Sequence, residues 1–423
     1  MVGWALTKGF YNWDIGKGGS ISESTAVYTI KNSSGVVQLT AGQGLSLRVM
    51  GVRDSQSLLV ASDIFTSELS DAFLMEICRA KLCGSSLTAL RDFDECQVFS
   101  NSEAASKVID IASVLGKLTG LVLVDCTASS ETIGLLNQAA ELGCCVVLAN
   151  KKPLASETRD YEKLLSRLRH IRYESTVSSF VPQVLVLLCW PSCDMLSDLD
   201  MLSDISFISM AKVGAGLPVI CSLTRILSSG DNIHRIVGSL SGTLGYVMSE
   251  LEDGKPFSQV VQAAKSLGYT EPDPRDDLGG MDVARKALIV SRLLGAQMNL
   301  DDIKVDSLYP DKMGPDKMTV QDFLENGLPS LDKDIEARVQ TASSNGNVLR
   351  YVCMIEGLRC TVGLKELPKH SALGRLRGSD NVVEVYSRCY PEQPLVIQGA
   401  GAGNDTTAAG VLADIVDLQD LFS

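Results

Sequence analysis

Apolar runs alternate with helical patterns through the first half of the chain. The segment LSLRVMGV, from Leu45, is almost continuously apolar, and LVLVDCTAS, CVVLANKKPL and IRYESTV repeat this character farther along. Residues 67–83, 131–143 and 159–168 instead space their apolar positions as an amphipathic helix does. Buried β-branched strands that alternate with helices predict a parallel α/β sheet with a doubly wound topology.

Two segments break this alternation. Residues 1–44 are irregular and rich in glycine, and residues 178–212 are first apolar and then repeat the tetrapeptide MLSD. We expect the second segment to be an insertion without a partner in the α/β pattern. Regularity resumes at Val213, with expected helices at 257–267 and 281–294, a polar connection at 311–333, antiparallel strands within 349–364 and 382–386, and a Gly-rich turn before a final helix.

Length and charge limit the possible classes of protein. With 423 residues, of which 45% are hydrophobic, the chain can form two or three domains with full cores. A net charge of −13 disfavours a nucleic-acid partner. No signal or transit peptide is evident, and the longest apolar run, 184–190, is shorter than the ~20 residues that span a bilayer. We therefore expect a soluble cytoplasmic protein with no membrane partner, and a plastid is the alternative compartment.

The most specific stretch is GYTEPDPRDDLGGMDVARK, residues 268–286, in which acidic residues crowd a loop that leads into a helix. Asp282 and Lys286 are four residues apart and therefore share one helix face. A surface loop with a single ion pair would explain this spacing. A small zwitterionic substrate would also explain the density of acids, because they can bind its ammonium group while the lysine handles its hydroxyl proton.

Polar residues also follow the predicted parallel strands. Asp125 to Thr127, Asn150 to Pro153 and Glu174 to Thr176 stand where ligands collect in such sheets. A helix cap and solvated turns are the simpler explanations for the first two groups. The Gly-rich segment QGAGAGNDTTAAG near the C-terminus suits a close approach of the backbone to a ligand, although it is not G-x-G-x-x-G.

Six segments occur in an order that resembles homoserine dehydrogenase: VDCTAS, ANKKPLA, VGAGLPVI, GSLSGTLGYV, GYTEPDPRDDLGGMDVARK and IQGAGAG. The resemblance runs from about Leu45 to Leu421, except for 178–212, and is to the single-function, plant-like form. It implies a Rossmann-like doubly wound parallel sheet and a second α/β domain for catalysis and dimerisation. The ranges are then 1–44 for an atypical segment, 45–177 for the nucleotide-binding domain, completed by about 395–423, 178–212 for the insertion, and 213–394 for the catalytic and dimerisation domain.

The resemblance also implies a reaction and a set of residues. The family uses NADP or NAD to interconvert L-homoserine and L-aspartate 4-semialdehyde, in the biosynthesis of threonine, methionine and isoleucine, and it forms homodimers. Lys286 becomes the proton donor or acceptor, and Lys151 its partner beside the cofactor. The implied substrate-binding residues are Glu271, Asp282, Asp277, Gly268 and Tyr269. The implied cofactor-binding residues are Thr127, Lys151 and Gly403. A sodium ion is implied at Glu174, Val177, Ala215 and Leu217.

Two departures from the family pattern affect ligand sites. No strand followed by G-x-G-x-x-G exists, and residues 1–44 do not resemble the family, so we expect weak cofactor binding. The sodium motif E-x-T-V-G-A-G-L is split, because deleting residues 178–213 would restore ESTVGAGLPVI. Restoring it by that deletion is expected to improve folding. Arg53 could meet the 2′-phosphate of NADP, although a solvated turn would explain it equally well.

Two alternatives remain open at this stage. The chain could be a catalytically impaired relative or a dimerising subunit, which a lack of NADPH binding would reveal. It could also be a semialdehyde dehydrogenase with Cys126 as the nucleophile, although the acidic motif at 268–286 argues against this. A zinc site is not expected, because the twelve cysteines form no C-x-x-C pair and only three histidines accompany them.

Overall fold

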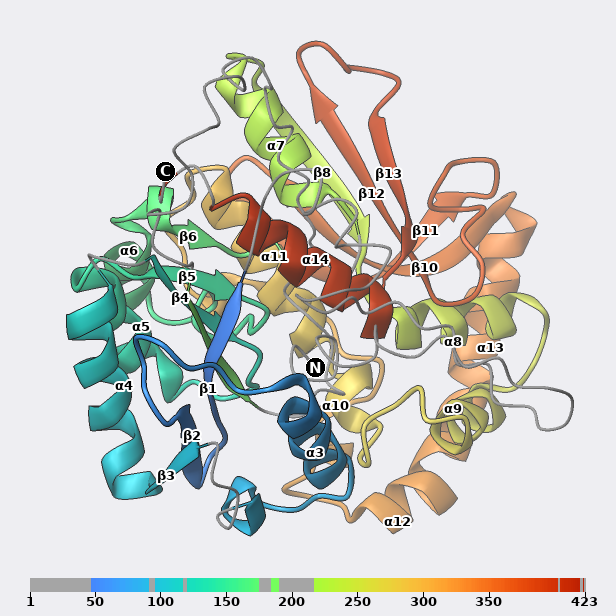
Figure 1. The fold of residues 1–423 in the computed structure, drawn as a ribbon. Helices are drawn as coiled ribbons and strands as arrows, with labels where there is room; N and C mark the ends of the chain where they lie inside the picture. Colours follow the sequence, from blue (N-terminus) through green and yellow to red (C-terminus); the bar gives the residue numbers. More distant parts are fainter. Residues whose placement is uncertain are drawn as a thin grey trace, which may run out of the picture. The chain divides into compact units, whose positions relative to one another are not determined.

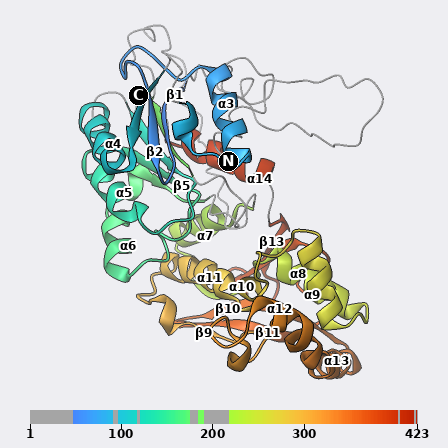
Figure 2. The ribbon, with the colours of Figure 1, turned by 90° about the horizontal axis from the view of Figure 1, so that it is seen from below.

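The computed structural model describes residues 47–90, 96–116, 120–174, 184–189, 217–401, 404–418 and 421. The chain divides into two units, one formed by residues 1–153, 159–210 and 403–423 and the other by residues 154–158 and 211–402. Each unit contains one β-sheet with associated helices (Figures 1 and 2). The atypical segment 1–44 and most of the segment 178–212 lie outside the described residues.

The first unit contains a seven-stranded sheet with the order β3-β2-β1-β7-β4-β5-β6. Its strands are β1 (Arg48–Arg53), β2 (Ser57–Ala61), β3 (Cys96–Ser100), β4 (Leu121–Asp125), β5 (Cys145–Leu148), β6 (Ile171–Arg172) and β7 (Leu185–Cys189). β4, β5 and β6 are parallel neighbours, as the alternating pattern predicts. The expected α/β class is confirmed, but the sheet is mixed because β2 and β7 run against their neighbours.

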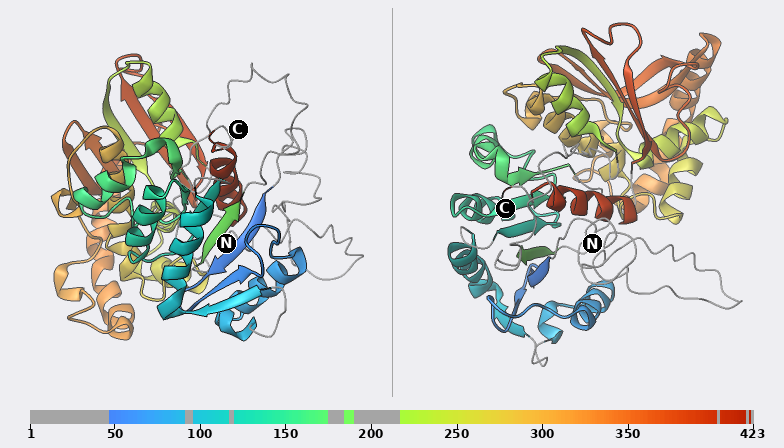
Figure 3. Two further views of the ribbon diagram at one scale, coloured as in Figure 1. Left: turned by 60° about the vertical axis from the view of Figure 1, so that its left-hand side comes forward. Right: turned by 45° about the horizontal axis from the view of Figure 1, so that its top comes forward.

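Three helices of this unit lie near the predicted ranges 67–83, 131–143 and 159–168, and a fourth follows the Gly-rich turn near the C-terminus, whereas the helix at 101–115 was not predicted. The helices are α3 (Asp71–Leu82), α4 (Asn101–Leu115), α5 (Thr132–Glu141), α6 (Thr158–Leu165) and α14 (Asn404–Val416), with short 3₁₀ turns at Leu87–Leu90 and Leu168–His170. The hydroxyl of Ser70 caps α3 by accepting from the N–H of Phe73. α4 and α5 pack against each other, and α14 packs against β5 (Figure 3).

Strand β7 corrects our expectation for the segment 178–212. Its five residues are buried and pair antiparallel with β1 on one side and β4 on the other, so that Leu187 faces both Gly51 and Leu123. The run VLVLLC is apolar on both sides of the strand, and only an interior position in the sheet buries both. A segment expected to lack a partner therefore supplies a central strand.

The position of β7 shows how this sheet differs from the Rossmann sheet that the resemblance implies. In the Rossmann order 3-2-1-4-5-6, the first strand lies between the second and the fourth. If β1 and β4 take the second and fourth places of that order, β7 occupies the place of the first strand, and it runs in the opposite direction to both neighbours. β1 leads through residues 54–56 into the antiparallel strand β2. The described part of the sheet therefore has no glycine-rich turn from a first strand into a helix.

The second unit contains a six-stranded sheet with the order β13-β12-β8-β10-β11-β9. Its strands are β8 (Ile233–Ser239), β9 (Lys304–Val305), β10 (Asn347–Glu356), β11 (Arg359–Pro368), β12 (Asp380–Ser387) and β13 (Leu395–Ala400). The hairpin of β10 and β11 and the pairs of β12 with β8 and β13 are antiparallel, which confirms the sequence prediction for this region.

Several helices accompany this sheet (Figure 1). They are α7 (Val219–Ser228), α8 (Gly242–Glu252), α9 (Phe257–Ser266), α10 (Arg275–Leu278), α11 (Met281–Leu293), α12 (Val320–Asp322) and α13 (Leu328–Ser344). α9 and α11 match the predicted helices closely. The expected polar connection at 311–333 is wrong in part, because it contains a 3₁₀ turn (Asp311–Met313), α12, a π-helical turn (Phe323–Gly327) and the start of α13. No helix among the described residues is long and apolar enough to cross a membrane.

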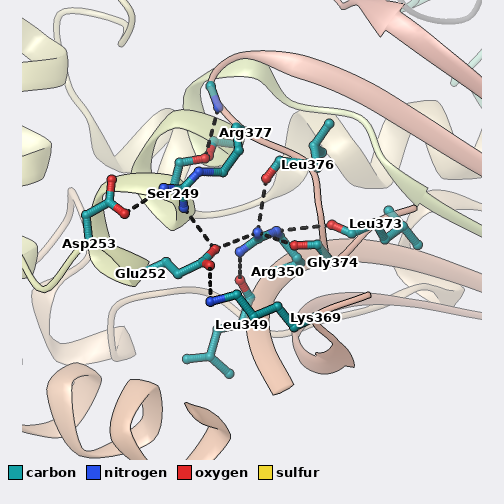
Figure 4. Close-up of polar contacts among 12 residues, drawn as sticks. Ser249, Glu252, Asp253, Leu349, Arg350, Lys369, Leu373, Gly374, Leu376 and Arg377 are labelled. Atoms are coloured by element: carbon teal, nitrogen blue, oxygen red, sulfur yellow. Dashed lines mark hydrogen bonds and ion pairs between the residues drawn. The ribbon is translucent and has the colours of Figure 1, made fainter. Parts of the chain in front are cut away.

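A buried arginine fixes the turn between β11 and β12 (Figure 4). Arg350 on β10 is 1% exposed, and its guanidinium donates to the carbonyl oxygens of Leu373, Gly374 and Leu376. It also pairs with Glu252 at the end of α8, at 2.8 Å. Removing one partner of a buried ion pair leaves the other uncompensated, so this contact holds the turn, α8 and β10 together.

We predict that Leu187→Asp prevents the first unit from folding, because an unpaired carboxylate at the centre of the sheet has no partner. Leu187 is fully buried, whereas Leu358 in the turn between β10 and β11 is 79% exposed, so Leu358→Asp is the matched control. Circular dichroism during urea unfolding should show the loss only in the first variant. A Leu187→Asp protein as stable as its parent would contradict the placement of β7.

Candidate active site

Helix α11 begins beside a position that requires glycine. Gly280 has a φ of 75°, and a Cβ there would lie 1.9 Å from the hydroxyl oxygen of Tyr351. This hydroxyl is itself fixed, because it donates to the carbonyl oxygen of Asp306 at 2.9 Å. Gly280 therefore lets α11 pack closely against β10 and sets the position of the side chains in its first two turns.

The ammonium group of Lys286 lies inside the second unit. The residue is 2% exposed, and its Nζ donates to the carbonyl oxygen of Leu240 at 2.7 Å and lies 3.1 Å from Oδ2 of Asp282. The predicted shared helix face of Asp282 and Lys286 is thus present. A buried ammonium group requires such polar partners. The two contacts orient Nζ toward the segment that joins β8 to α8.

Acidic groups gather in the loop before α11. The backbone N–H of Glu271 donates to Oδ2 of Asp277 at 2.8 Å. Burial raises the pKa of Asp277 to about 6; the charges of Glu271 and Asp282 also raise it, and hydrogen bonds from Glu271 and Thr243 partly oppose this. A carboxyl group in this environment favours the arrival of a cation, which would relieve the repulsion among the acids.

Two residues hold this acidic loop in place. Arg275 is 3% exposed; it pairs with Asp273 at 2.6 Å and donates to the carbonyl oxygens of Met313 and Met318. The hydroxyl of Thr243, in the first turn of α8, donates to the carbonyl oxygen of Tyr269 at 2.5 Å. The loop is therefore tied both to the 313–318 segment and to α8.

The other two predicted substrate residues have clear local roles. Gly268 has a φ of 73° and ends α9, since the N–H of Tyr269 donates to the carbonyl oxygen of Ala264 across it. Tyr269 is 48% exposed, and its ring contacts that of Tyr246 edge to face, with centroids 5.1 Å apart. The structure thus brings Gly268, Tyr269, Glu271 and Asp277 together in one loop.

In the first unit, the ends of β4 and β5 meet as the parallel pattern predicts. Nδ2 of Asn150 donates to Oδ2 of Asp125 and to Oγ1 of Thr127, each at 3.1 Å. Burial raises the pKa of Asp125, while hydrogen bonds from Thr127, Thr132 and Asn150 lower it. Lys151 follows this cluster and is half-buried. Thr127 and Lys151, the predicted cofactor residues, therefore stand at one edge of the sheet.

The predicted sodium ligands are only partly described. Glu174 is 6% exposed and comes two residues after β6, and Leu217 is 5% exposed and packs against Gly399. Val177, Ala215 and the cofactor residue Gly403 lie outside the described residues. Within the described part of the chain, no three His, Cys, Asp or Glu side chains cluster as metal ligands. A site built on one carboxylate and backbone carbonyls would not require such a cluster.

Sequence reasoning did not single out three groups that organise these sites. They are the carbonyl of Leu240, the hydroxyl of Thr243 and the guanidinium of Arg275. Thr243 and Leu240 lie within GSLSGTLGYV, so the motif indicates this segment but not that the Thr243 hydroxyl and the Leu240 carbonyl make the contacts. Cys126, the alternative nucleophile, is 2% exposed, which argues against attack on an external substrate.

Comparisons with known proteins identify the family of the second unit. A family model described as homoserine dehydrogenase matches residues 218–416. The chain is 43% identical over 221 residues to a homoserine dehydrogenase of Paracoccidioides brasiliensis, which covers 50% of this chain and 59% of that protein. It is 35% identical over 295 residues to a bifunctional aspartokinase/homoserine dehydrogenase of Haemophilus influenzae, over 70% of this chain and 32% of that protein. Residues 218–416 are therefore a homoserine dehydrogenase domain.

The fold is also that of the homoserine dehydrogenase family. A hyperthermophilic archaeal homoserine dehydrogenase in complex with NADPH superposes with a TM-score of 0.59 at 18% identity, over 92% of this chain and 94% of that one. This likeness confirms the Rossmann-like α/β class. The chain spans about a third of the length of the bifunctional relative and about three fifths of the fungal one.

We predict that Asp277 makes folding stability pH-dependent. Its pKa of about 6 exceeds the ordinary value near 4, so the folded state is penalised as this carboxyl loses its proton, and the contribution of Asp277 to stability should fall from pH 4 to pH 7. Asp277→Asn should remove this fall, with a gain at pH 7 of up to about 3 kcal/mol, less because the side chain is partly exposed. Asp301→Asn, at an exposed position, is the control. Parallel urea-stability profiles for parent and Asp277→Asn between pH 4 and 7 would contradict the assignment.

Proposed function

We propose that this protein is an NADP(H)-dependent homoserine dehydrogenase that interconverts L-homoserine and L-aspartate 4-semialdehyde. The supporting observation is the environment of Lys286, a buried lysine between the carboxylate of Asp282 and the carbonyl of Leu240. Its helix follows directly from the loop of acids at 271–277. This combination suits an amino acid that carries both an ammonium group and a reacting oxygen.

In this proposal the acids bind the substrate and the lysine moves the proton. Glu271 and Asp282 receive the ammonium group of homoserine, and Asp277 adds negative charge once it is deprotonated. Gly268 and Tyr269 line the same place. Lys286, as the neutral amine, accepts the hydroxyl proton when the alcohol is oxidised and the hydride leaves for the nicotinamide; as the ammonium group it returns that proton to the oxygen in the reverse direction. Lys151 is its partner on the side of the cofactor.

The described residues fit the cofactor unequally. The bound nicotinamide supplies hydride acceptance and donation. Thr127 and Lys151, at the edge formed by β4 and β5, and Gly403 would hold it, and Arg53 at the end of β1 would favour NADP over NAD. The pyrophosphate lacks its usual support, because β1 leads into another strand and no G-x-G-x-x-G exists. We therefore propose a weakened cofactor site.

Further parts of the proposal follow from family membership. A sodium ion would be held by Glu174 and by the carbonyls of Val177, Ala215 and Leu217. The protein would act as a homodimer in the cytoplasm or, alternatively, in a plastid. Its reaction would supply homoserine for threonine, methionine and isoleucine biosynthesis.

We predict that Lys286→Met lowers kcat by about 10²–10⁴-fold, the usual contribution of a general acid or base, because methionine fills the space without carrying a proton. The control is Lys304→Ala, whose parent side chain is 74% exposed. Both variants should be assayed for homoserine-dependent reduction of NADP after their thermal unfolding midpoints are compared. An unchanged kcat in folded Lys286→Met would remove this lysine from the mechanism.

We also predict how two repairs of the nucleotide-binding unit combine. One replaces residues 1–44 with a strand, a G-x-G-x-x-G turn and a helix, and the other deletes residues 178–213. Since β7 fills the central position, the deletion alone should unfold the unit, and the graft alone should gain little NADPH affinity because no position is free. This reverses the improved folding expected from sequence. Only both changes together should give a folded protein that binds NADPH more tightly, as measured by calorimetry. A folded protein after deletion alone would contradict this account.

A further inference from the structure

The guanidinium group of Arg275 makes a closed set of contacts within the second unit. Its Nε and Nη2 atoms donate to the carboxylate of Asp273 at 2.6–3.1 Å, and Nη1 donates to the carbonyl oxygens of Met313 and Met318 at 3.1 and 2.7 Å. Its central carbon lies 5.2 Å from the centre of the Phe323 ring, which is fully buried. One acid, two carbonyl groups and a ring face therefore satisfy this cation.

The other acids of the same loop have no such partner. Glu271 and Asp277 form no ion pair with a residue in the described part of the chain, and Asp282 is already paired with Lys286 at 3.1 Å. The N–H of Glu271 donates to Oδ2 of Asp277, and the charges of these two residues interact. Both residues are partly exposed, so a cation in solution can reach them. The loop therefore keeps two acids without a cation, although it contains an arginine.

The backbone explains why Arg275 pairs with Asp273 and not with these acids. The N–H of Arg275 also donates to Oδ1 of Asp273 at 3.0 Å, so main-chain and side-chain hydrogen bonds join the same two residues. Pro274 lies between them with a φ of −60°, which restricts the backbone further. Without these contacts, an arginine side chain is long enough to pair with a neighbouring carboxylate. Such an ion pair would occupy the place of a substrate ammonium group.

We propose that Arg275 is a positioning residue that gives this site its preference for substrates with an ammonium group. It does not touch the substrate. It fixes the loop that carries Glu271 and Asp277, and its pairing with Asp273 keeps its own positive charge away from them. The segment that supplies the two carbonyl groups and the Phe323 ring thereby contributes to substrate selection. This inference rests on the proposed dehydrogenase function.

The test compares two ligands that differ only in the ammonium group. L-Homoserine and 4-hydroxybutanoate are titrated calorimetrically to millimolar concentration, with and without NADPH, which cannot react with either alcohol. The parent should prefer L-homoserine. Arg275→Lys keeps the charge but cannot reproduce the planar fork that reaches Asp273 and both carbonyl groups. It should bind L-homoserine roughly tenfold or more weakly, the equivalent of one charge-assisted hydrogen bond, and its affinity for 4-hydroxybutanoate should change little.

Arg350→Lys is the matched control (Figure 4). Arg350 is equally buried in the same unit, pairs with Glu252 and donates to three backbone carbonyl groups, but it lies outside the acidic loop. Thermal unfolding midpoints should fall for both lysine variants, whereas only Arg275→Lys should lose the preference. A loss of preference in both variants, or in neither, would overturn the proposal, as would equal weakening of both ligands in Arg275→Lys.

A second variant covers the case in which Arg275→Lys does not fold. Asp273→Asn retains an oxygen acceptor for the guanidinium but removes the charge that balances it, so the arginine should compete with the ligand and the same loss of preference is expected. If neither variant folds, Arg275 is a structural residue and the proposal is overturned. If the parent binds L-homoserine under neither condition, the proposed function fails together with this inference.

Discussion

The contact of Lys286 with Leu240 and Asp282 is the interaction on which the second unit is organised. A buried ammonium group is tolerated only with polar partners at hydrogen-bond distance, so α11 and the segment between β8 and α8 must meet at one point. Glycine at position 280, where φ is 75°, lets α11 lie directly against Tyr351 of β10. Arg275 and Thr243 then hold the acidic loop next to the helix.

The first unit depends on a different constraint, which is that the facing backbone groups of β1 and β4 at the centre of the sheet need hydrogen-bonding partners. β1 and β4 both expose hydrogen-bonding groups to the position between them, and β7 satisfies them from a segment that breaks the family pattern. The same strand stands where a first strand leading into a phosphate-binding turn would be expected. A strand that completes the sheet in this way and a strand that leads into a pyrophosphate-binding turn would therefore need the same position between β1 and β4, and only one of them can occupy it.

Much of the fold could be predicted from the sequence, for identifiable reasons. β4, β5, α5, α9 and α11 have strong periodicity and clear ends, and their predicted ranges agree with the structure. β7 could not be predicted, because the run VLVLLC indicates a buried strand without revealing its neighbours. α13 was missed because Pro329 and the polar residues around it look like a loop, although proline is well tolerated at a helix start.

The sequence predicted those parts of the candidate site that depend on side chains within one motif. It did not predict the parts that depend on backbone atoms or on residues far apart in the sequence. Asp282 and Lys286 follow from spacing along one helix. The contact of Lys286 with the carbonyl of Leu240 depends on how α11 packs beside the end of β8, which no single motif contains. The raised pKa of Asp277 likewise depends on burial that the acidic sequence alone would not suggest.

The most direct test of the central claim follows the hydrogen that leaves the substrate. L-homoserine carrying two deuterium atoms on the carbon that bears the hydroxyl is incubated with NADP⁺ and the protein, and both products are analysed by mass spectrometry. The account predicts one deuterium in the reduced cofactor and one in the aldehyde, formed at equal rates. Folded protein that forms neither labelled product at any substrate or cofactor concentration would contradict it.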